Sequence, residues 1–258
     1  MDETTINSKQ NSNLKRVRAT FAGKEPGVIA LEGSRLVQDA VRSGLRLELL
    51  LADSRNSSLL TELESHAGEA RLVADGLLDG IGGVKTSPGV VALCREPRTA
   101  QLEDLELGAR TRFLAIDGIA DPGNLGALAR SAEALGVSAL LIVSGGARPW
   151  SPKALRGSMG SLLRLPVAFF ESADALGSEL AARDIRQVVA LTRGGETPAS
   201  YAWRGPLALW VSSEVGQSGS LAPGMDGVTI EMDGAAESLN VTVAASLLLQ
   251  AAREGVDR

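Results

Sequence analysis

Residues 117–132, DGIADPGNLGALARSA, follow the apolar run FLAI and contain the start of a helix. Asp121 suits the N-cap position, and Pro122 suits the first helical position, where its missing N–H removes no hydrogen bond. Leucines and alanines then recur at helical spacing, so one face of the helix should pack against a core. The stretch therefore predicts a strand at residues 113–116, a turn, and an amphipathic helix at residues 122–135.

The opposite face of this predicted helix carries Arg130. Because helical side chains lean toward the N-terminus, Arg130 should extend over Gly123 and Gly126, which have no side chain to block it. Asn124, the exposed N–H groups of the first turn and the Arg130 guanidinium would then converge, which suits a phosphate or a developing oxyanion. The alternative for this stretch is a capped amphipathic helix with one solvated arginine.

The second half of the chain alternates between strand-like and helix-like segments. Strands are predicted at residues 113–116, 139–143, 167–170, 187–191, 207–211 and 228–232. Helices are predicted at residues 122–135, 152–162, 173–183 and 239–252. This alternation predicts an α/β fold, a mostly parallel sheet with helices on both faces, whose ligands bind at the carboxyl ends of the strands. No strand is followed by G-x-G-x-x-G with a later acidic residue, so the ordinary dinucleotide site is not supported.

The first half of the chain predicts a smaller α/β domain. Its strands are expected at residues 28–31, 47–51, 71–73 and 90–94, and its helices at residues 34–43, 56–67 and 75–81. We expect a disordered tail at residues 1–13, this domain at residues 14–95, a charged linker at residues 96–110, and a second domain at residues 111–258. A chain of 258 residues is long enough for two such domains.

Composition excludes several classes of protein. The apolar runs are too short for a membrane span and the N-terminus, MDETTINSKQ, has no apolar signal region, so we expect a cytoplasmic protein that is not bound to a membrane. The single cysteine, Cys94, excludes an internal disulfide and should be buried. The single histidine, His66, should lie on the surface. These counts disfavour a zinc site or a Ser-His-Asp triad, and we predict no metal site.

The charge of the chain does not by itself indicate nucleic-acid binding. The formal net charge is −5 and the isoelectric point is about 5.1, whereas a general nucleic-acid binder is usually basic. Contacts with RNA would need local basic clusters, and a run of charges is more often a solvated face. The candidate clusters are Lys9, Lys15, Arg16, Arg18 and Lys24, and Arg148, Lys153, Arg156 and Arg164.

Four stretches, in the expected order, resemble the SpoU/TrmH family of RNA ribose 2′-O-methyltransferases, which belongs to the SPOUT superfamily. Residues 121–132 (DPGNLGALARSA), 209–216 (LWVSSEVG) and 228–243 (VTIEMDGAAESLNVTV) resemble the three motifs of the family. Residues 151–166 (SPKALRGSMGSLLRLP) are typical of the segment between motifs one and two. The match covers roughly residues 111–254. It implies S-adenosylmethionine as the cofactor, RNA as the substrate, a homodimer, and a C-terminal trefoil knot.

The resemblance also implies roles for individual residues. Residues that would contact the reacting groups or hold them are Arg130, Asn124, Glu214, Ser238 and Asn240. Residues that would bind the cofactor are Thr192, Gly194, Ser212, Ser213, Gly216, Ile230, Met232 and Leu239. In the family, Glu214 helps to hold the arginine of the first motif.

Three of these positions allow a physical argument. A guanidinium stays protonated, so Arg130 fits a stabiliser of the developing alkoxide better than a base, although both roles stay open. Ser212 stands where the family usually has glycine and would be strained if that position required a positive φ. Ser238 is expected to be the N-cap of the last helix.

The first domain carries a second resemblance. Residues 30–33 (ALEG) and residues 86–90 (TSPGV) resemble the substrate-binding domain that precedes the methyltransferase domain in many family members. That domain is similar to a ribosomal protein that binds kinked RNA. The resemblance favours 23S rRNA as the substrate, in either a housekeeping or an antibiotic-resistance role. The alternatives are a tRNA 2′-O-methyltransferase, or a non-catalytic RNA-binding or ribosome-assembly protein.

Overall fold

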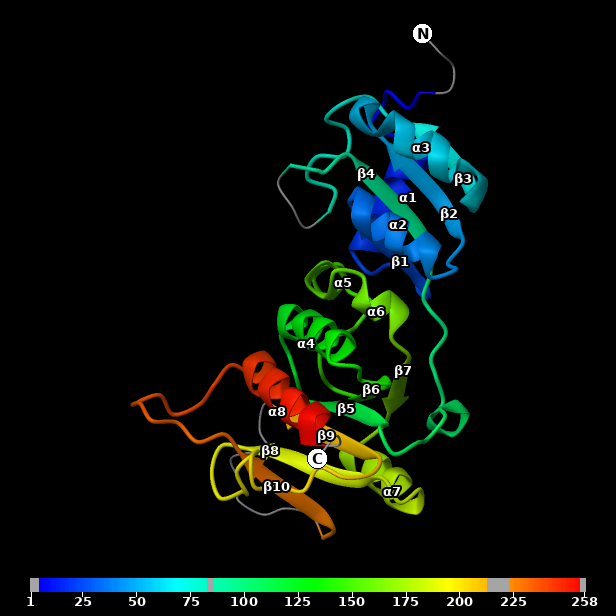
Figure 1. Cartoon of the computed structure of the whole chain (residues 1–258). Coiled ribbons are helices and arrows are strands. Elements are labelled where there is room, and N and C mark those ends of the chain that lie inside the picture. Colours follow the sequence, from blue (N-terminus) through cyan, green and yellow to red (C-terminus); the bar gives the residue numbers. More distant parts are fainter. Residues whose placement is uncertain (1–4, 83–85, 213–222, 256–258) are drawn as a thin grey trace. The chain divides into compact units, whose positions relative to one another are not determined.

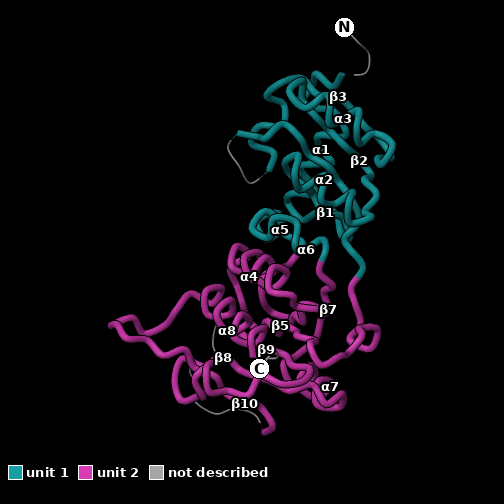
Figure 2. Tube along the Cα trace, in the orientation of Figure 1, with its two compact units in different colours: residues 1–98, 150–164 teal, residues 99–149, 165–258 magenta. Residues whose placement is uncertain are grey.

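The computed structural model describes residues 5–82, 86–212 and 223–255 (Figure 1). The chain divides into two compact units, each built on one β-sheet (Figure 2). Unit 1 consists of residues 1–98 and 150–164, and unit 2 consists of residues 99–149 and 165–258.

Unit 2 contains a six-stranded sheet in the order β10-β8-β9-β5-β6-β7. All of its strand pairs are parallel, which confirms the prediction of a mostly parallel sheet. The strands are β5 (Arg112–Asp117), β6 (Ala139–Val143), β7 (Val167–Phe170), β8 (Arg186–Leu191), β9 (Leu207–Ser212) and β10 (Met225–Thr229).

Helices cover both faces of this sheet. On one face, Leu176 and Leu180 of α7 (Ala173–Ala182) join a buried cluster with Phe113, Leu141 and Trp210. On the other face, α4 (Pro122–Ala134) and α8 (Val241–Gly255) pack against each other, and α8 also contacts β8 and β9. Because side chains alternate along a strand, each buried strand supplies both cores.

Unit 1 contains a four-stranded mixed sheet in the order β1-β4-β2-β3. Strand β4 is antiparallel to β1 and β2, and β2 is parallel to β3. The strands are β1 (Val28–Glu32), β2 (Leu47–Ala52), β3 (Ala67–Leu72) and β4 (Val90–Arg95). The helices are α1 (Ser12–Phe21), α2 (Ser34–Arg42), α3 (Ser57–Leu63), α5 (Pro152–Ser158) and α6 (Ser161–Arg164). Short 3₁₀ helices in the chain are η1 (Ser54–Asn56), η2 (Glu64–His66) and η3 (Leu102–Asp104).

The start of the chain differs from the expected disordered tail. Ile6 pairs with Val73 in an isolated β-bridge and is only 8% exposed. Helix α1, which we did not predict, begins at Ser12 behind the N-cap Asn11 and buries Leu14 and other residues against the sheet. This segment is mostly polar, so its few apolar residues, which anchor it, formed no clear pattern in the sequence.

Two predicted helices differ in the structure. Residues 75–81 form turns instead of a helix, and Gly76 and Gly80 adopt φ values of +80° and +67° there. Residues 152–162 form two short helices, α5 and α6, because Met159 and Gly160 adopt φ values of +50° and +87° between them. A residue in the left-handed conformation ends an α-helix, and in the sequence only the glycines indicate such a residue.

The end of the chain also differs in detail. The last strand occupies Met225–Thr229 instead of residues 228–232, in register with β8. The last helix begins at Val241, and its N-cap is Asn240, whose Oδ1 accepts a hydrogen bond of 2.9 Å from the N–H of Thr242. Ser238 is therefore not the cap of α8.

Two of the remaining expectations concern single residues, and both are confirmed. Cys94 in β4 is fully buried, and burial raises the pKa of its thiol to about 12. His66 is exposed in η2. Within the described residues, no helix is both long and apolar enough to cross a membrane.

The caps of α7 provide a test of local stability. Ser172 is the N-cap and accepts a hydrogen bond of 3.1 Å from the N–H of Ala175. Replacing Ser172 by alanine should lower the free energy of unfolding by about 1 kcal/mol, because that N–H loses its partner. Ser178→Ala, the same change at an exposed interior position of α7, should be neutral or stabilising by about 0.5 kcal/mol. Urea unfolding measures both, and equal effects of the two changes would contradict the capping argument.

Candidate functional site

A cavity of about 320 Å³ lies in unit 2 at the carboxyl ends of β8, β9 and β10. Thr192 follows β8, Ser212 ends β9 and Ile230 follows β10. The other wall comes from the segment before α8 and from the first turns of α8. The lining residues are Ala190, Leu191, Thr192, Val211, Ser212, Ile230, Met232, Ser238, Leu239, Val241, Ala244 and Leu248.

The loop that follows β8 is fixed against β10. The N–H of Gly195 donates a hydrogen bond of 2.9 Å to Oγ1 of Thr229, and Glu196 forms a parallel β-bridge with Val228. A Cβ atom on Gly195 would lie 2.6 Å from the carbonyl carbon of Gly227, so no larger residue fits there. This close backbone contact positions the wall of the cavity that contains Thr192.

The starts of α4 and α8 lie side by side. Nδ2 of Asn240 donates a hydrogen bond of 3.3 Å to Oδ1 of Asn124, and Oγ of Ser246 donates one of 2.8 Å to Oγ of Ser131. Asp121 caps α4 by accepting a hydrogen bond of 2.9 Å from the N–H of Asn124, as predicted. The structure thus brings the first and third motifs together, and the positive ends of two helix dipoles with them.

Arg130 is exposed on α4, one turn after the buried Gly126. Among the residues that the structure describes, Arg130 has no hydrogen-bond or ion-pair partner. Its guanidinium donors are therefore available to a ligand. Glu214, its expected partner, lies outside the described residues, as do Ser213 and Gly216.

The structure places most of the other expected site residues at the cavity. Five of the expected cofactor residues and Ser238 line it, namely Thr192, Ser212, Ile230, Met232, Leu239 and Ser238. Gly194 lies in the turn after β8 with φ of +84° and does not line the cavity. Ser212 belongs to β9 and does not have a positive φ, so the expected strain is absent at this residue.

Motif reasoning missed half of the cavity wall. Val211 and Leu191 are apolar strand ends, while Ala244 and Leu248 are four residues apart on one face of α8. Their spacing is visible in the sequence, but an ordinary core position has the same spacing. Only the tertiary arrangement distinguishes these residues from core residues.

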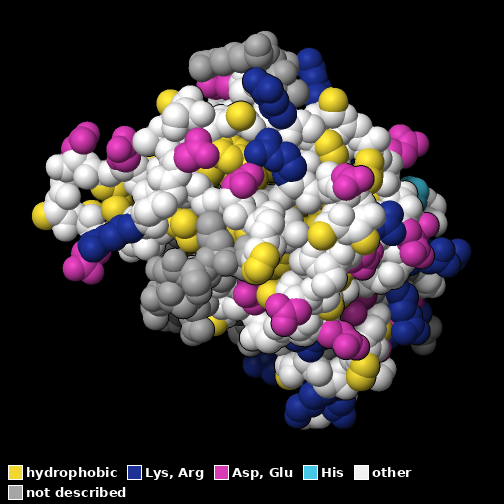
Figure 3. Space-filling model, turned by 90° about the horizontal axis from the view of Figure 1, so that it is seen from below, with side chains coloured by type: hydrophobic (Ala, Val, Ile, Leu, Met, Phe, Trp, Pro, Cys, Tyr) yellow, Lys and Arg dark blue, Asp and Glu magenta, His cyan; other side chains and the backbone are white. Residues whose placement is uncertain are grey.

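Ion pairs neutralise several of the expected basic residues. Arg16 pairs with Glu25 at 2.6 Å and also with Glu48, and the hydrogen bonds to these carboxylates raise the pKa of the guanidinium. Arg156 pairs with Glu32 at 3.3 Å, and acidic and basic side chains are interspersed on the face shown in Figure 3. The face in Figure 3 therefore does not offer a broad basic surface for RNA.

The chemistry of the cavity is apolar with a few hydroxyl groups. Leu191, Val211, Ile230 and other apolar side chains form its walls, and hydroxyls come from three residues, Thr192, Ser212 and Ser238. Over the described ranges of the chain, no three His, Cys, Asp or Glu side chains are grouped so that they could hold a metal ion. Such a lining suits an organic ligand with an apolar ring system and a few polar groups.

The fold and the cavity define a class of α/β proteins in which a ligand binds where the carboxyl ends of three neighbouring parallel strands meet the start of the last helix. The model of the SpoU rRNA Methylase family matches residues 111–250. The chain therefore belongs to the SpoU rRNA methylase family.

Named relatives match from 78% to 95% of the chain. The 23S rRNA (guanosine(2553)-2′-O)-methyltransferase RlmP of Bacillus subtilis is 27% identical over 95% of this chain and 97% of its own length. The 23S rRNA (guanosine-2′-O-)-methyltransferase RlmB of Xylella fastidiosa is 34% identical over 78% of this chain and 85% of its own length.

Two solved structures have the same fold. The AdoMet-bound rRNA methyltransferase from Sinorhizobium meliloti superimposes with a TM-score of 0.82 at 26% identity, over 97% of both chains. The SpoU methyltransferase AviRb from Streptomyces viridochromogenes, in complex with AdoMet, also gives a TM-score of 0.82 at 26% identity, over 95% of this chain and 98% of that one.

Proposed function

We propose that this protein is an S-adenosylmethionine-dependent methyltransferase that methylates a ribose 2′-hydroxyl in RNA, with 23S rRNA as the substrate. The cavity at the meeting point of the three turns carries the proposal, because it lies in a chain of this family and contains most of the expected cofactor residues. A relative named as a 23S rRNA enzyme matches 95% of the chain, which favours rRNA over the tRNA alternative.

The lining of the cavity fits S-adenosylmethionine, which when bound supplies a methyl group on a positively charged sulfur. Ile230, Met232 and Leu239 offer apolar surface to the adenosine. The hydroxyls of Thr192 and Ser212 and the neighbouring backbone offer hydrogen bonds to its polar groups. We assign Gly194, Ser213 and Gly216 to the same pocket, as the resemblance implies.

Arg130 is the group that we assign to the attacking oxygen. Methyl transfer breaks the bond between carbon and sulfur, forms a bond between carbon and the ribose oxygen, and releases the hydroxyl proton to solvent. A protonated guanidinium stabilises the negative charge that grows on this oxygen and can also hold the adjacent phosphate. Asn124, Asn240 and Ser238 orient the reacting groups, and Glu214 holds Arg130.

The remaining assignments concern the whole chain. We propose that residues 14–95 bind the RNA substrate, that residues 96–110 link them to a methyltransferase domain at residues 111–258, of which residues 150–164 pack with unit 1, and that this domain contains a trefoil knot. The supporting observations are the separate four-stranded sheet and a family match that begins at residue 111. Because the proposed substrate is rRNA, we expect the protein in the cytoplasm.

We also propose a homodimer. The exposed apolar residues Val243 and Leu247 are four residues apart on α8 and are 47% and 49% exposed, and Leu239, which precedes the helix, is 37% exposed. Residues with this spacing lie on one helix face, and an exposed apolar stripe of this kind suits a protein interface.

The test of the proposed function is methyl transfer to purified 23S rRNA. The protein, with labelled S-adenosylmethionine and a chelator, should methylate 23S rRNA isolated from a strain that lacks the gene. Mass spectrometry should then locate the label on a single ribose. Binding of S-adenosylmethionine without transfer to any RNA would contradict the enzymatic function, and absence of binding would also contradict the cofactor.

Arg130→Ala should lower kcat by about 10²–10³-fold, because the oxyanion loses a preorganised donor. The Kd for S-adenosylmethionine, measured by calorimetry, should stay unchanged, since Arg130 does not line the cavity. Arg130→Lys should be almost as inactive, because lysine keeps the charge but loses the planar fork. The matched control is Arg253→Ala, another exposed arginine of unit 2. An active lysine variant with a new pH dependence would instead indicate a base.

Leu247→Glu should convert the dimer into monomers, because a carboxylate at the centre of an apolar interface would lose its hydration, which costs free energy. Light scattering should show a mass near the 26.8 kDa of one chain instead of twice that value. Leu107→Glu changes a residue that is 41% exposed but lies outside α8, and it should leave the dimer intact. A wild-type protein that is monomeric at working concentration would exclude the homodimer.

A further inference from the structure

A second cavity, also of about 320 Å³, lies within unit 1 and shares no residue with the first. Its apolar walls come from Leu36 of α2, Pro88 in the loop before β4, and Leu155 and Met159 of the α5 segment. Its charged side chains include Glu32 at the end of β1 and Arg35 and Arg156 on the two helices. We refer to it as the α2–α5 pocket.

The wall formed by Met159 has an unusual backbone. Met159 adopts left-handed dihedral angles, with φ of +50° and ψ of +41°, and its side chain is 38% exposed. Methionine has no intrinsic preference for this conformation, and a large apolar side chain gains nothing from exposure. Residues in such a conformation often lie at functional sites, and here the conformation places a polarisable side chain at a pocket.

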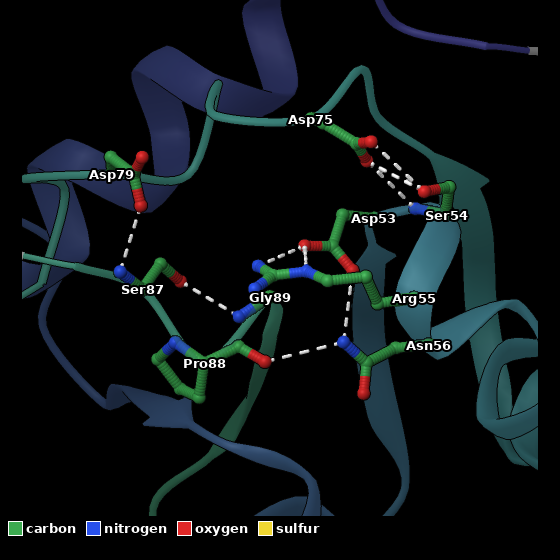
Figure 4. Close-up of polar contacts among 9 residues, drawn as sticks. All are labelled: Asp53, Ser54, Arg55, Asn56, Asp75, Asp79, Ser87, Pro88 and Gly89. Carbon is green, nitrogen blue, oxygen red and sulfur yellow. Dashed lines mark hydrogen bonds and ion pairs between the residues drawn. The ribbon is translucent and has the colours of Figure 1, made fainter.

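The wall formed by Pro88 is held by a network of polar groups around the buried Asp53 (Figure 4). Nδ2 of Asn56 donates hydrogen bonds to Oδ1 of Asp53 at 2.9 Å and to the carbonyl oxygen of Pro88 at 3.2 Å. The backbone N–H of Asp53 donates to the carbonyl oxygen of Gly89 at 2.9 Å. Gly89 has φ of +83°, and a Cβ atom there would collide with the Asp53 carboxylate.

The carboxylate of Asp53 in this network also stays charged. Burial raises the pKa of Asp53, but hydrogen bonds from Arg55 and Asn56 outweigh that effect and lower it below the usual range. Asp53 therefore stays ionised at neutral pH, and its side chain is only 3% exposed. Pro88, which is itself exposed, is thus hydrogen-bonded through its carbonyl oxygen to a network built on an ionised, buried carboxylate.

The charged side chains of the pocket differ in how far they are exposed. Nη1 of Arg156 lies 3.3 Å from Oε2 of Glu32, whose side chain is only 2% exposed, so Arg156, which is 31% exposed, offers guanidinium donors while the Glu32 carboxylate is not accessible. Asp39, whose side chain is 12% exposed, adds a second carboxylate and lies 3.6 Å from Nη1 of Arg164. Arg35 is exposed at the start of α2 and pairs with none of the residues in the described part of the chain. The pocket therefore combines apolar walls, the guanidinium donors of Arg156, the carboxylate of Asp39 and the exposed cation of Arg35.

We infer that the α2–α5 pocket binds an unpaired nucleobase of the RNA substrate, at a nucleotide other than the one that is methylated. A nucleobase has two flat apolar faces and an edge that carries both donors and acceptors, which matches this combination of groups. Arg35 is placed to contact the phosphate of that nucleotide or to stack on its base. The inference rests on the proposed function and adds a determinant of substrate choice to it.

The test measures RNA binding separately from methyl transfer. Filter binding uses 23S rRNA from the strain that lacks the gene, and the full-length protein. Arg35→Ala and Met159→Gly should each raise the Kd for this RNA roughly tenfold, as expected for one charged contact or one stacked base. Glycine accepts the left-handed backbone of Met159, so that variant should fold. The affinity for S-adenosylmethionine should not change in either variant.

The matched control is Arg46→Ala, which removes an arginine of unit 1 that is exposed, has no partner among the described residues and does not line the pocket. It should change the Kd for RNA less than twofold, because it alters only the net charge. Photo-crosslinking with 4-thiouridine-substituted 23S rRNA should label peptides that contain Arg35 or Met159. Equal Kd values for the wild type and both pocket variants would overturn the inference and would favour another protein, instead of RNA, as the ligand of the pocket.

Failure of this inference can be told apart from failure of the proposed function. A wild-type protein that methylates 23S rRNA, with pocket variants that bind it normally, would refute the pocket alone. A wild-type protein that binds 23S rRNA through the pocket but transfers no methyl group would refute the enzyme alone. Crosslinks confined to peptides outside the pocket would also refute the pocket.

Discussion

The parallel pairing of β8 with both β9 and β10 is the constraint on which the rest of the site depends. Parallel strands that are hydrogen-bonded neighbours end on the same edge of the sheet, so the turns that follow them must meet. Thr192, Ser212 and Ile230 are far apart in the sequence, yet this pairing brings them to one cavity. The tight contact of Gly195 with Gly227 then leaves the loop after β8 little freedom.

The contact of α4 with α8 brings together residues that we propose for the reaction. The hydrogen bonds between Asn240 and Asn124 and between Ser246 and Ser131 hold the first motif against the third. Both helices present capped N-termini there, and their aligned N–H groups favour negative charge. Arg130 supplies a further positive charge on an otherwise acidic chain, which fits a site that must stabilise an alkoxide and hold a phosphate.

The net charge of −5 does not prevent binding of an RNA substrate, because individual arginines can make local contacts with it. Several arginines, such as Arg16 and Arg156, are paired with carboxylates and contribute little long-range field. Arginines such as Arg130 and Arg35, which have no such partner among the described residues, can then act locally. Recognition of this kind depends on shaped pockets and specific contacts more than on a general attraction between opposite charges.

The sequence by itself determined the order and type of most elements in the parallel sheet, because hydrophobic periodicity and capping residues act over short distances. Asp121 as a cap and the burial of Cys94 could be predicted in this way. The resemblance to the family also indicated Thr192, Ile230 and Met232 as residues of the binding site, and all three line the cavity. Gly194 was indicated by the same resemblance, but it lies outside the cavity lining.

Only the tertiary structure decided the features that depend on distant neighbours. Ile6 is ordered because it pairs with Val73, and the break at Met159 has no signal in the sequence except the glycine that follows it. The start of α8 at Val241 and the cap at Asn240 differ from the expected cap at Ser238. The second half of the cavity wall consists of ordinary apolar residues, which become a binding surface only when three strand ends and a helix leave a space between them.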